Sequence, residues 1–237
     1  MEDQYDYRLY IGYDYGDSWY DNASNWQDLS IFIKRESTQT GRSKTKLSFR
    51  AIILFGIDQR ITAVWNTIAS VALKDQCDYF YPANDDLELI TKGWTSGAIH
   101  ALKSCHVASN FGIATFRDVT VCMAPTFHLV HRTHLDFHNG FYYPIPAHGA
   151  AQDPWIYSLY RPWRCAFVLK QYQIRNHIGL TSGPRYDYAD RSRLDQWIQR
   201  GRRELYGRLS TFNSSRYNQS FVNYSLLNLD LNWDTPC

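Results

Sequence analysis

Strand-length and helix-length apolar patterns alternate along the first half of the chain, and this alternation constrains the fold more than any other feature. Leu47–Phe55 is an apolar run of strand length, as in a sheet covered on both faces. Ile61–Leu73 then places apolar residues at helical spacing. Further strands are predicted at Tyr7–Gly12, Tyr79–Ala83 and Phe111–Thr115, and a further helix at Gly97–Cys105. Strand–helix–strand order predicts an α/β fold with substantial parallel pairing.

Domain organisation follows from the absence of a linker. No Pro/Gly/Ser-rich segment divides the 237 residues, so we expect one domain over residues 1–209. Inside it, Leu194–Leu209 has helical apolar spacing with a basic outer face, and Glu36–Lys46 is predicted to be a mobile surface loop. Residues 210–237 are rich in Asn and Ser and are expected to be irregular.

Composition argues against several classes of protein. The net charge of +2 argues against a dedicated nucleic-acid binder, which normally has a strong basic stripe. No apolar run is long enough to span a bilayer. The acidic start of the chain is unlike a signal peptide, and five scattered cysteines without a CxxC pair indicate mostly reduced thiols. Asn-x-Ser sequons at Asn22, Asn213, Asn218 and Asn223 point instead to a secretory lumen, so the compartment stays open between that lumen and the cytoplasm.

Acidic and amide side chains follow directly on the predicted strand Tyr79–Ala83. Asn84, Asp85 and Asp86 stand in succession, and Glu88 adds a fourth oxygen group. Carboxylates at the end of a buried strand are costly unless a cation meets them, and hard oxygen ligands suit Mg²⁺ or Mn²⁺. In open α/β sheets, ligands bind beyond the carboxyl ends of the strands. The segment therefore indicates metal–phosphate binding, with an Asx-rich turn that caps the next helix as the structural alternative.

Asp153 is the second candidate, because it stands directly before Pro154 and Trp155. A carboxylate in a pocket can act as a general base that deprotonates an acceptor hydroxyl. Pro favours the first turn of a helix, so a plain helix N-cap is the alternative reading of Asp153. If Asp153 is a general base, Trp155 would line its pocket or simply fill the core.

Histidines form the third pattern. Four of them recur at short spacing around Arg132, and this spacing suits a zinc hydrolase, although HExxH is missing: His128, His131, His134 and His138. Arg132 can instead hold phosphate or acceptor oxygens through its planar fork, and satisfied structural histidines are the other alternative. His177 can join carboxylates around Mn²⁺ or lie on the surface. The missing GxxxxGK[ST], GxGxxG and GxSxG patterns argue against an ATPase, a dehydrogenase and a serine hydrolase.

In their order and spacing, these motifs over roughly residues 7–190 resemble a GT-A-type glycosyltransferase, most like the inverting family 2 enzymes. They are also similar to GT-A domains of algae and large algal viruses. Tyr10–Asp14 corresponds to the family's nucleotide-binding loop, and Asn66 to the Asn of an Arg-Asn pair. Asn84–Asp86 stands at the Asp-x-Asp motif, with Asn84 in place of its first Asp. Pro125–Phe137, Gly140-Phe141 and Gln152-Asp153 follow in the family's order, with Gln152 in place of an acid.

The resemblance implies an α/β, GT-A-like fold with a mixed, mainly parallel sheet flanked by helices. It implies that Asp153 is the catalytic base and that Asp86 and His177 bind Mn²⁺ or Mg²⁺. Six residues are expected to contact the nucleotide-sugar: Asp14, Asp58, Asn66, Asn84, Asp85 and Arg132.

The function that follows is an enzyme that transfers a sugar from a nucleotide-sugar donor to a hydroxyl of a glycan or another acceptor, with inversion. No nucleic-acid partner and no membrane span in this chain are expected. Three alternatives stay open: a retaining transferase, a catalytically inactive module of the same fold that binds nucleotide or sugar, and a zinc hydrolase built on the histidines.

Overall fold

The computed structural model describes residues 2–39, 47–57, 60–120, 125–147, 151–177 and 193–211. The chain divides into two compact units, Met1–Asp58 and Gln59–Cys237, with a boundary that lies inside the single domain expected from the sequence. Among the described helices, none has both the length and the apolar character needed to cross a membrane.

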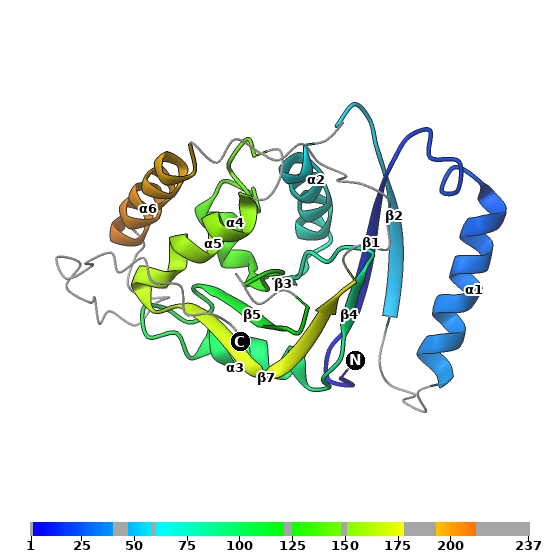
Figure 1. Cartoon of the computed structure of the whole chain (residues 1–237), viewed down its shortest axis with the longest axis horizontal. Coiled ribbons are helices and arrows are strands. Elements are labelled where there is room, and N and C mark those ends of the chain that lie inside the picture. Colours follow the sequence, from blue (N-terminus) through cyan, green and yellow to red (C-terminus); the bar gives the residue numbers. More distant parts are fainter. Residues whose placement is uncertain are drawn as a thin grey trace. The chain divides into compact units, whose positions relative to one another are not determined.

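The first unit is a βαβ arrangement, blue to cyan in Figure 1. β1 (Tyr7–Asp14) pairs with β2 (Leu47–Leu54) in parallel, and α1 (Ala23–Gln39) lies between them in sequence. Parallel neighbours need such a crossover, because a tight turn can join only antiparallel strands. The two strands predicted here are confirmed. The predicted loop at Glu36–Lys46 is wrong in its first part, which continues α1 to Gln39, and its remainder lies outside the described residues.

The prediction that Leu47–Phe55 is covered on both faces is wrong. Ile53 is 46% exposed and Phe55, just past the strand, is 66% exposed. An apolar run shows only that a strand can be buried, and the covering elements have to be supplied by the rest of the fold. On the described part of the first unit, buried packing gathers instead around Tyr13, which stacks on Tyr20 and also contacts Trp26.

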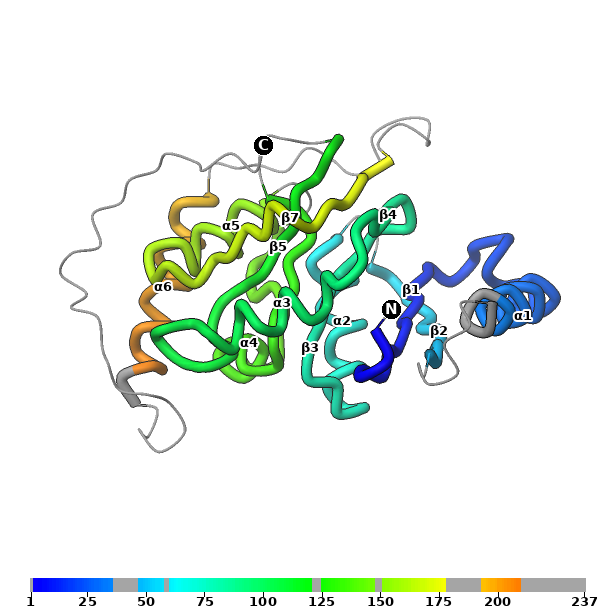
Figure 2. Tube along the Cα trace, turned by 90° about the horizontal axis from the view of Figure 1, so that it is seen from below, coloured from blue at the N-terminus to red at the C-terminus, as the bar shows by residue number. Residues whose placement is uncertain are grey.

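Strands of the second unit form small, mixed sheets rather than the mainly parallel sheet expected. β7 (Ala166–Asn176) lies between β5 (Ile113–Asp118), to which it is parallel, and β4 (Leu87–Leu89), to which it is antiparallel. Figure 2 shows β5 and β7 running side by side. β3 (Tyr79–Phe80) pairs antiparallel with β6 (Val130–His131), so the strand predicted at Tyr79–Ala83 is only two residues long. The α/β class is confirmed, in this mixed form.

Helices pack on these strands. α3 (Trp94–Lys103) contacts β5 and β7, whereas α5 (Gln152–Tyr160) contacts β5 and α6 (Leu194–Thr211), and Figure 1 shows α3 and α5 on opposite sides of the strands. The remaining helices are α2 (Ile61–Lys74), α4 (Arg132–Phe137) and the short 3₁₀ helix η1 (Arg161–Trp163). The helices predicted at Ile61–Leu73, Gly97–Cys105 and Leu194–Leu209 are therefore confirmed to within a few residues. The tail predicted from residue 210 lies almost wholly outside the described residues.

β5 is the centre of the core. Five of its six residues are buried, and it carries Phe116 into a cluster with Leu102 of α3 and Ile174 of β7. Full burial of such side chains stabilises a fold by about 1.5–3 kcal/mol each. This packing fixes β7, and the end of β7 in turn positions the site described below.

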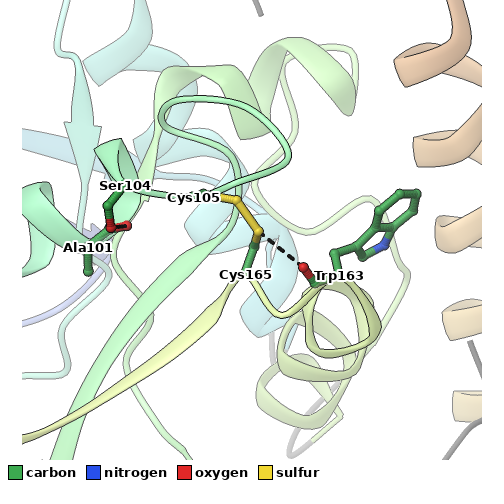
Figure 3. The surroundings of a disulfide bond; sticks show 5 residues. All are labelled: Ala101, Ser104, Cys105, Trp163 and Cys165. Atoms are coloured by element: carbon green, nitrogen blue, oxygen red, sulfur yellow. Dashed lines mark hydrogen bonds between the residues drawn. A yellow bond between two sulfur atoms is a disulfide. The ribbon is translucent and has the colours of Figure 1, made fainter. Parts of the chain in front are cut away.

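A disulfide between Cys105 and Cys165 joins the end of α3 to the start of β7 (Figure 3). The prediction of mostly reduced thiols is wrong for this pair, which 60 residues separate in sequence. Gly112 lets the two segments approach closely here. Its φ is +119°, and a Cβ at this position would lie 2.1 Å from the carbonyl oxygen of Cys165. Cys77 is not in a disulfide, and Cys122 and Cys237 lie outside the described residues.

Candidate functional site

A pocket of about 90 Å³ opens in the second unit, where α2, the turn before β4, the start of α5 and the end of β7 meet. Apolar and aromatic side chains form one part of its wall, and polar side chains form the other. The lining residues are Ile61, Trp65, Pro82, Asn84, Thr126, Phe127, Tyr143, Gln152, Asp153 and Asn176. Its volume is several times the space that one water molecule needs, so it suits an ion with its ligands or one reacting group.

Asn84 and Asp153, two of the predicted site residues, line this same pocket. Asn84 stands in the turn that leads into β4, closed by a hydrogen bond from the Leu87 amide to the Asn84 carbonyl (3.3 Å). The element after this turn is a strand, so the alternative of a helix cap at Asn84–Asp86 is wrong. Two predicted site residues from distant segments of the sequence thus lie in one pocket.

Asp153 lies in the first turn of α5, whose N-cap is Ala151, so the plain N-cap reading of Asp153 is wrong. Its side chain is 29% exposed and reaches the pocket. The positive end of the helix dipole favours a carboxylate at this position. Trp155, two residues after Asp153, is fully buried and donates a hydrogen bond to the Trp197 carbonyl (3.2 Å), so it fills the core.

His128 stands behind Asp153. It is fully buried, and its Nδ1 lies 3.5 Å from Oδ1 of Asp153. Neither ring nitrogen has a hydrogen-bond partner within the described part of the chain. Asp153 is the single charged side chain among the lining residues given above.

Three buried oxygens at and beside the pocket have no hydrogen-bond partner among the described residues: Oε1 of Gln152, Oδ1 of Asn176 and Oδ1 of Asp86. Gln152 and Asn176 line the pocket, whereas Asp86 lies in the adjoining turn. A buried acceptor without a donor costs about 1–3 kcal/mol, and such groups are rare in native folds. Carboxylate and amide oxygens are the ligands that Mg²⁺ and Mn²⁺ prefer, so the donor set fits such an ion.

His177 is beside Asp86, but through the backbone. Its amide donates to the Asp86 carbonyl (2.9 Å), whereas its ring nitrogen Nε2 lies 3.0 Å from Oε2 of Glu88. Arg175, opposite Glu88 in the β4–β7 ladder, binds the same oxygen at 2.9 Å. The hydrogen bond from His177, assisted by Arg175, lowers the pKa of the Glu88 carboxyl. The structure therefore places the His177 ring in an exposed ion-pair cluster rather than on the Asp86 side chain.

Three His, Cys, Asp or Glu side chains can hold a metal ion together where their ligand atoms lie within 4.8 Å of one another. Within the described ranges, the single such group is Cys105, His106 and Cys165, and its two thiols are joined in the disulfide. The histidine series around Arg132 contributes no such group there. Two of its members, His134 and His138, contact each other edge to face, with ring centroids 4.6 Å apart.

His134 is buried between two tyrosines: Nδ1 lies 2.6 Å from the Tyr160 hydroxyl, and Nε2 lies 2.7 Å from the Tyr142 carbonyl. His131 caps α4, because its ring accepts a hydrogen bond from the Thr133 amide. These two histidines are satisfied structural residues, as the structural alternative expected.

Burial lowers the pKa of His134 from 6.5 to about 4. The unfolded chain therefore binds more protons than the folded chain between these two pH values, so the free energy of unfolding falls as the pH falls through that window. We expect a loss of about 3 kcal/mol from His134 between pH 7 and pH 4, at about 1.4 kcal/mol for each unit of pKa shift. Urea titrations at several pH values measure it. His134→Gln is expected to show a shallower pH dependence, and equal slopes for the two proteins would contradict the assignment.

Asn66 has a structural part in the wall of the pocket. Its Nδ2 donates to the Tyr143 carbonyl (2.8 Å), and its Oδ1 accepts from the Tyr143 amide (2.7 Å). The side-chain amide thus pairs with one backbone residue as a neighbouring strand would, and it holds Tyr143 at the pocket. Its polar atoms are engaged there rather than pointing to a nucleotide.

Asn66→Ala is therefore expected to lower the free energy of unfolding by roughly 1–3 kcal/mol, because it removes two hydrogen bonds and leaves buried backbone groups of Tyr143 unpaired. Chemical denaturation measures the change. Ser70→Ala, which removes a local bond to the Thr67 carbonyl of the same helix, is the matched control and is expected to change the stability by ~0.5 kcal/mol or less. Equal effects of the two changes would contradict the role of Asn66.

Two other predicted binding residues of the second unit, Arg132 and Asp85, are not among those that line the pocket. Arg132 begins α4, with its amide bonded to the Asp78 carbonyl (2.7 Å) and its guanidinium 3.8 Å from the Asp78 carboxylate. Asp85 is exposed in the turn, Asp14 ends β1 in the first unit, and Asp58 lies outside the described residues. Asn176 lines the pocket, although the sequence favoured its neighbour His177 as a ligand.

No protein-family model matches the chain, and neither does any curated protein or any solved structure. One accessible carboxylate, 3.5 Å from a buried imidazole, shares the pocket with amide side chains whose oxygens can accept a hydrogen bond or a cation.

Proposed function

We propose that the chain is a metal-dependent glycosyltransferase that moves a sugar from a nucleotide-sugar to a hydroxyl of a glycan or another acceptor. One observation carries the proposal: Asn84 and Asp153, which correspond to the metal motif and the base of that class, line one pocket. They come from segments far apart in the sequence, and their shared pocket is consistent with the order of motifs.

Asp153 is the base in this proposal. Its carboxylate accepts the proton of the acceptor hydroxyl as the oxygen attacks the anomeric carbon, and the bond from that carbon to the diphosphate breaks. His128, 3.5 Å away, is placed to hold the carboxylate in position. Displacement from the side opposite the leaving group inverts the anomeric centre, and analysis of the product anomer distinguishes this course from retention.

Mn²⁺ or Mg²⁺ would neutralise the charge that develops on the departing diphosphate. The side chains suited to hold it are Asp86, Asn84 and Asn176, because oxygens of Asp86 and Asn176 are buried without a partner within the described residues. The pocket is small, about 90 Å³, so it suits the reacting centre, with the base and ribose of the donor extending beyond it.

A binding module without turnover is the second candidate. It is favoured by the amides Asn84 and Gln152, which leave Asp153 as the one carboxylate among the residues that line the pocket. An amide oxygen binds a divalent ion without offsetting its charge, so the affinity for metal is expected to be lower than with two carboxylates.

A thermal-shift screen of nucleotide-sugars, with and without Mn²⁺, tests the proposal. A ligand at a hundred times its Kd stabilises the folded state by about 2.7 kcal/mol, so a bound donor raises the Tm measurably. We expect a shift that needs Mn²⁺, that is lost in Asp86→Asn and that is retained in Asp136→Asn, a matched change of an exposed carboxylate on α4. No shift with any donor, or an equal shift in Asp86→Asn, would contradict the metal-dependent binding.

A further inference from the structure

The Cys105–Cys165 bond is built into the core of the second unit. Cys165 is fully buried and Cys105 is 7% exposed. The Cys165 carbonyl also accepts a hydrogen bond from the Ile113 amide at the start of β5 (2.9 Å), and the Cys165 sulfur contacts the Trp163 carbonyl, as Figure 3 shows. Disulfides form and persist in oxidising compartments and are rare where thiol reductants are abundant. This bond therefore bears on the compartment that the sequence left open.

The sequon Asn22-Ala-Ser24 is exposed at the start of α1 in the first unit. Oδ1 of Asn22 accepts from the Ser24 amide (3.0 Å) and from the Ser24 hydroxyl (2.8 Å), which caps the helix. Both bonds use the carbonyl oxygen of the side chain. A substituent on Nδ2 therefore leaves the cap intact, and the folded chain can carry it without losing a helix end.

We propose that Asn22 is an N-glycosylation site, in a chain that folds in the oxidising lumen of the secretory pathway. The sequon and the disulfide lie in different units and have different chemistry, yet both belong to that compartment. This inference does not rest on the transferase activity, and an inactive binding module would carry the same modification.

Disulfide formation and glycosylation each need a co-reactant. In disulfide formation, two thiols lose two protons and two electrons, and the disulfide of a thiol–disulfide oxidoreductase is reduced to a dithiol. In glycosylation, Nδ2 of Asn22 forms a bond to the anomeric carbon of a lipid-diphosphate-linked glycan, loses a proton, and the carbon–oxygen bond to the diphosphate breaks.

Peptide mapping of the full chain, purified from the cells that naturally make it, tests the proposal. The Asn22 peptide is expected to carry a glycan that peptide-N-glycosidase removes with conversion of Asn22 to Asp, and the peptides of Cys105 and Cys165 are expected to be linked before reduction. The modification must be assigned on the Asn22 peptide itself, because the chain has other sequons, which lie outside the described residues. An unmodified Asn22 overturns the glycosylation site, and free Cys105 and Cys165 thiols in the folded protein overturn the oxidising compartment.

Variants made in a eukaryotic secretory host separate the sequon from the helix cap. Asn22→Asp keeps the capping oxygen and Ser24→Ala keeps Asn22, and both are expected to lose the glycan at this site. Ser24→Thr preserves the sequon and is expected to keep it. A glycan that stays on residue 22 of Ser24→Ala, or that is missing from both the wild type and Ser24→Thr, would contradict the proposal.

Discussion

Asp153→Asn is expected to slow sugar transfer by ~10²–10⁴-fold, the loss that follows when general-base assistance is removed. The change keeps the size of the side chain and its place in the first turn of α5, but an amide cannot accept the proton of the acceptor hydroxyl. Because Asp153 is 29% exposed, the fold is expected to tolerate the substitution. Release of nucleoside diphosphate from the best donor, followed under saturating metal, measures the rate.

Asp136→Asn is the control for this result, because it removes an exposed carboxylate of α4 away from the lining residues. It is expected to retain the wild-type rate. Donor binding by Asp153→Asn, measured as a thermal shift, is expected to stay close to that of the wild type, so the loss falls on the chemical step. A folded Asp153→Asn protein with the wild-type rate would show that another group, or none, accepts the proton.

Loss of the disulfide has the second large expected effect. The Cys105→Ser, Cys165→Ser double variant is expected to lose about 4 kcal/mol of the free energy of unfolding, because the bond closes a loop of 60 residues and so limits the unfolded chain. For a protein of this size, that loss corresponds to a Tm lower by roughly 8–16 °C. Thermal unfolding of the wild type, with and without reductant, and of the double variant measures the difference.

Cys77→Ser is the matched control, because Cys77 is not in a disulfide. It is expected to change the Tm little, and reductant is expected to lower the Tm of this variant as much as that of the wild type. A double variant as stable as the wild type, or a Tm that reductant does not change, would show that the bond does not stabilise the folded chain.

The spacing of apolar residues along the sequence was enough to predict several helices and strands. Apolar spacing gave α2 and α6 to within a few residues, and β1 by its apolar run. Pairing could not be obtained this way, since β4 and β6 are two or three residues long and their antiparallel partners are far away in sequence. The disulfide was missed for the same reason, because its two cysteines are far apart in sequence and are brought together by the tertiary fold.

The candidate site was predictable in part. Asn84 and Asp153 were selected by chemistry and order, and both line the pocket. The choice of His177 over Asn176 shows the limit, because successive side chains of a strand point to opposite faces. At the end of β7, Arg175 and His177 both turn to Glu88, whereas Asn176 between them lines the pocket. A shift of one residue therefore changes the face, and sequence alone did not show which face meets the turn at Asn84.

Turnover of a panel of nucleotide-sugars by the full chain is the measurement that tests the central claim most directly. The account predicts that at least one donor loses its sugar to an acceptor or to water, that chelation of divalent ions stops the reaction, and that added Mn²⁺ restores it. It also predicts that Asp86→Asn and Asp153→Asn both lose this activity while remaining folded. Tight binding of a nucleotide-sugar with no turnover of any donor would contradict the transferase and leave a binding module.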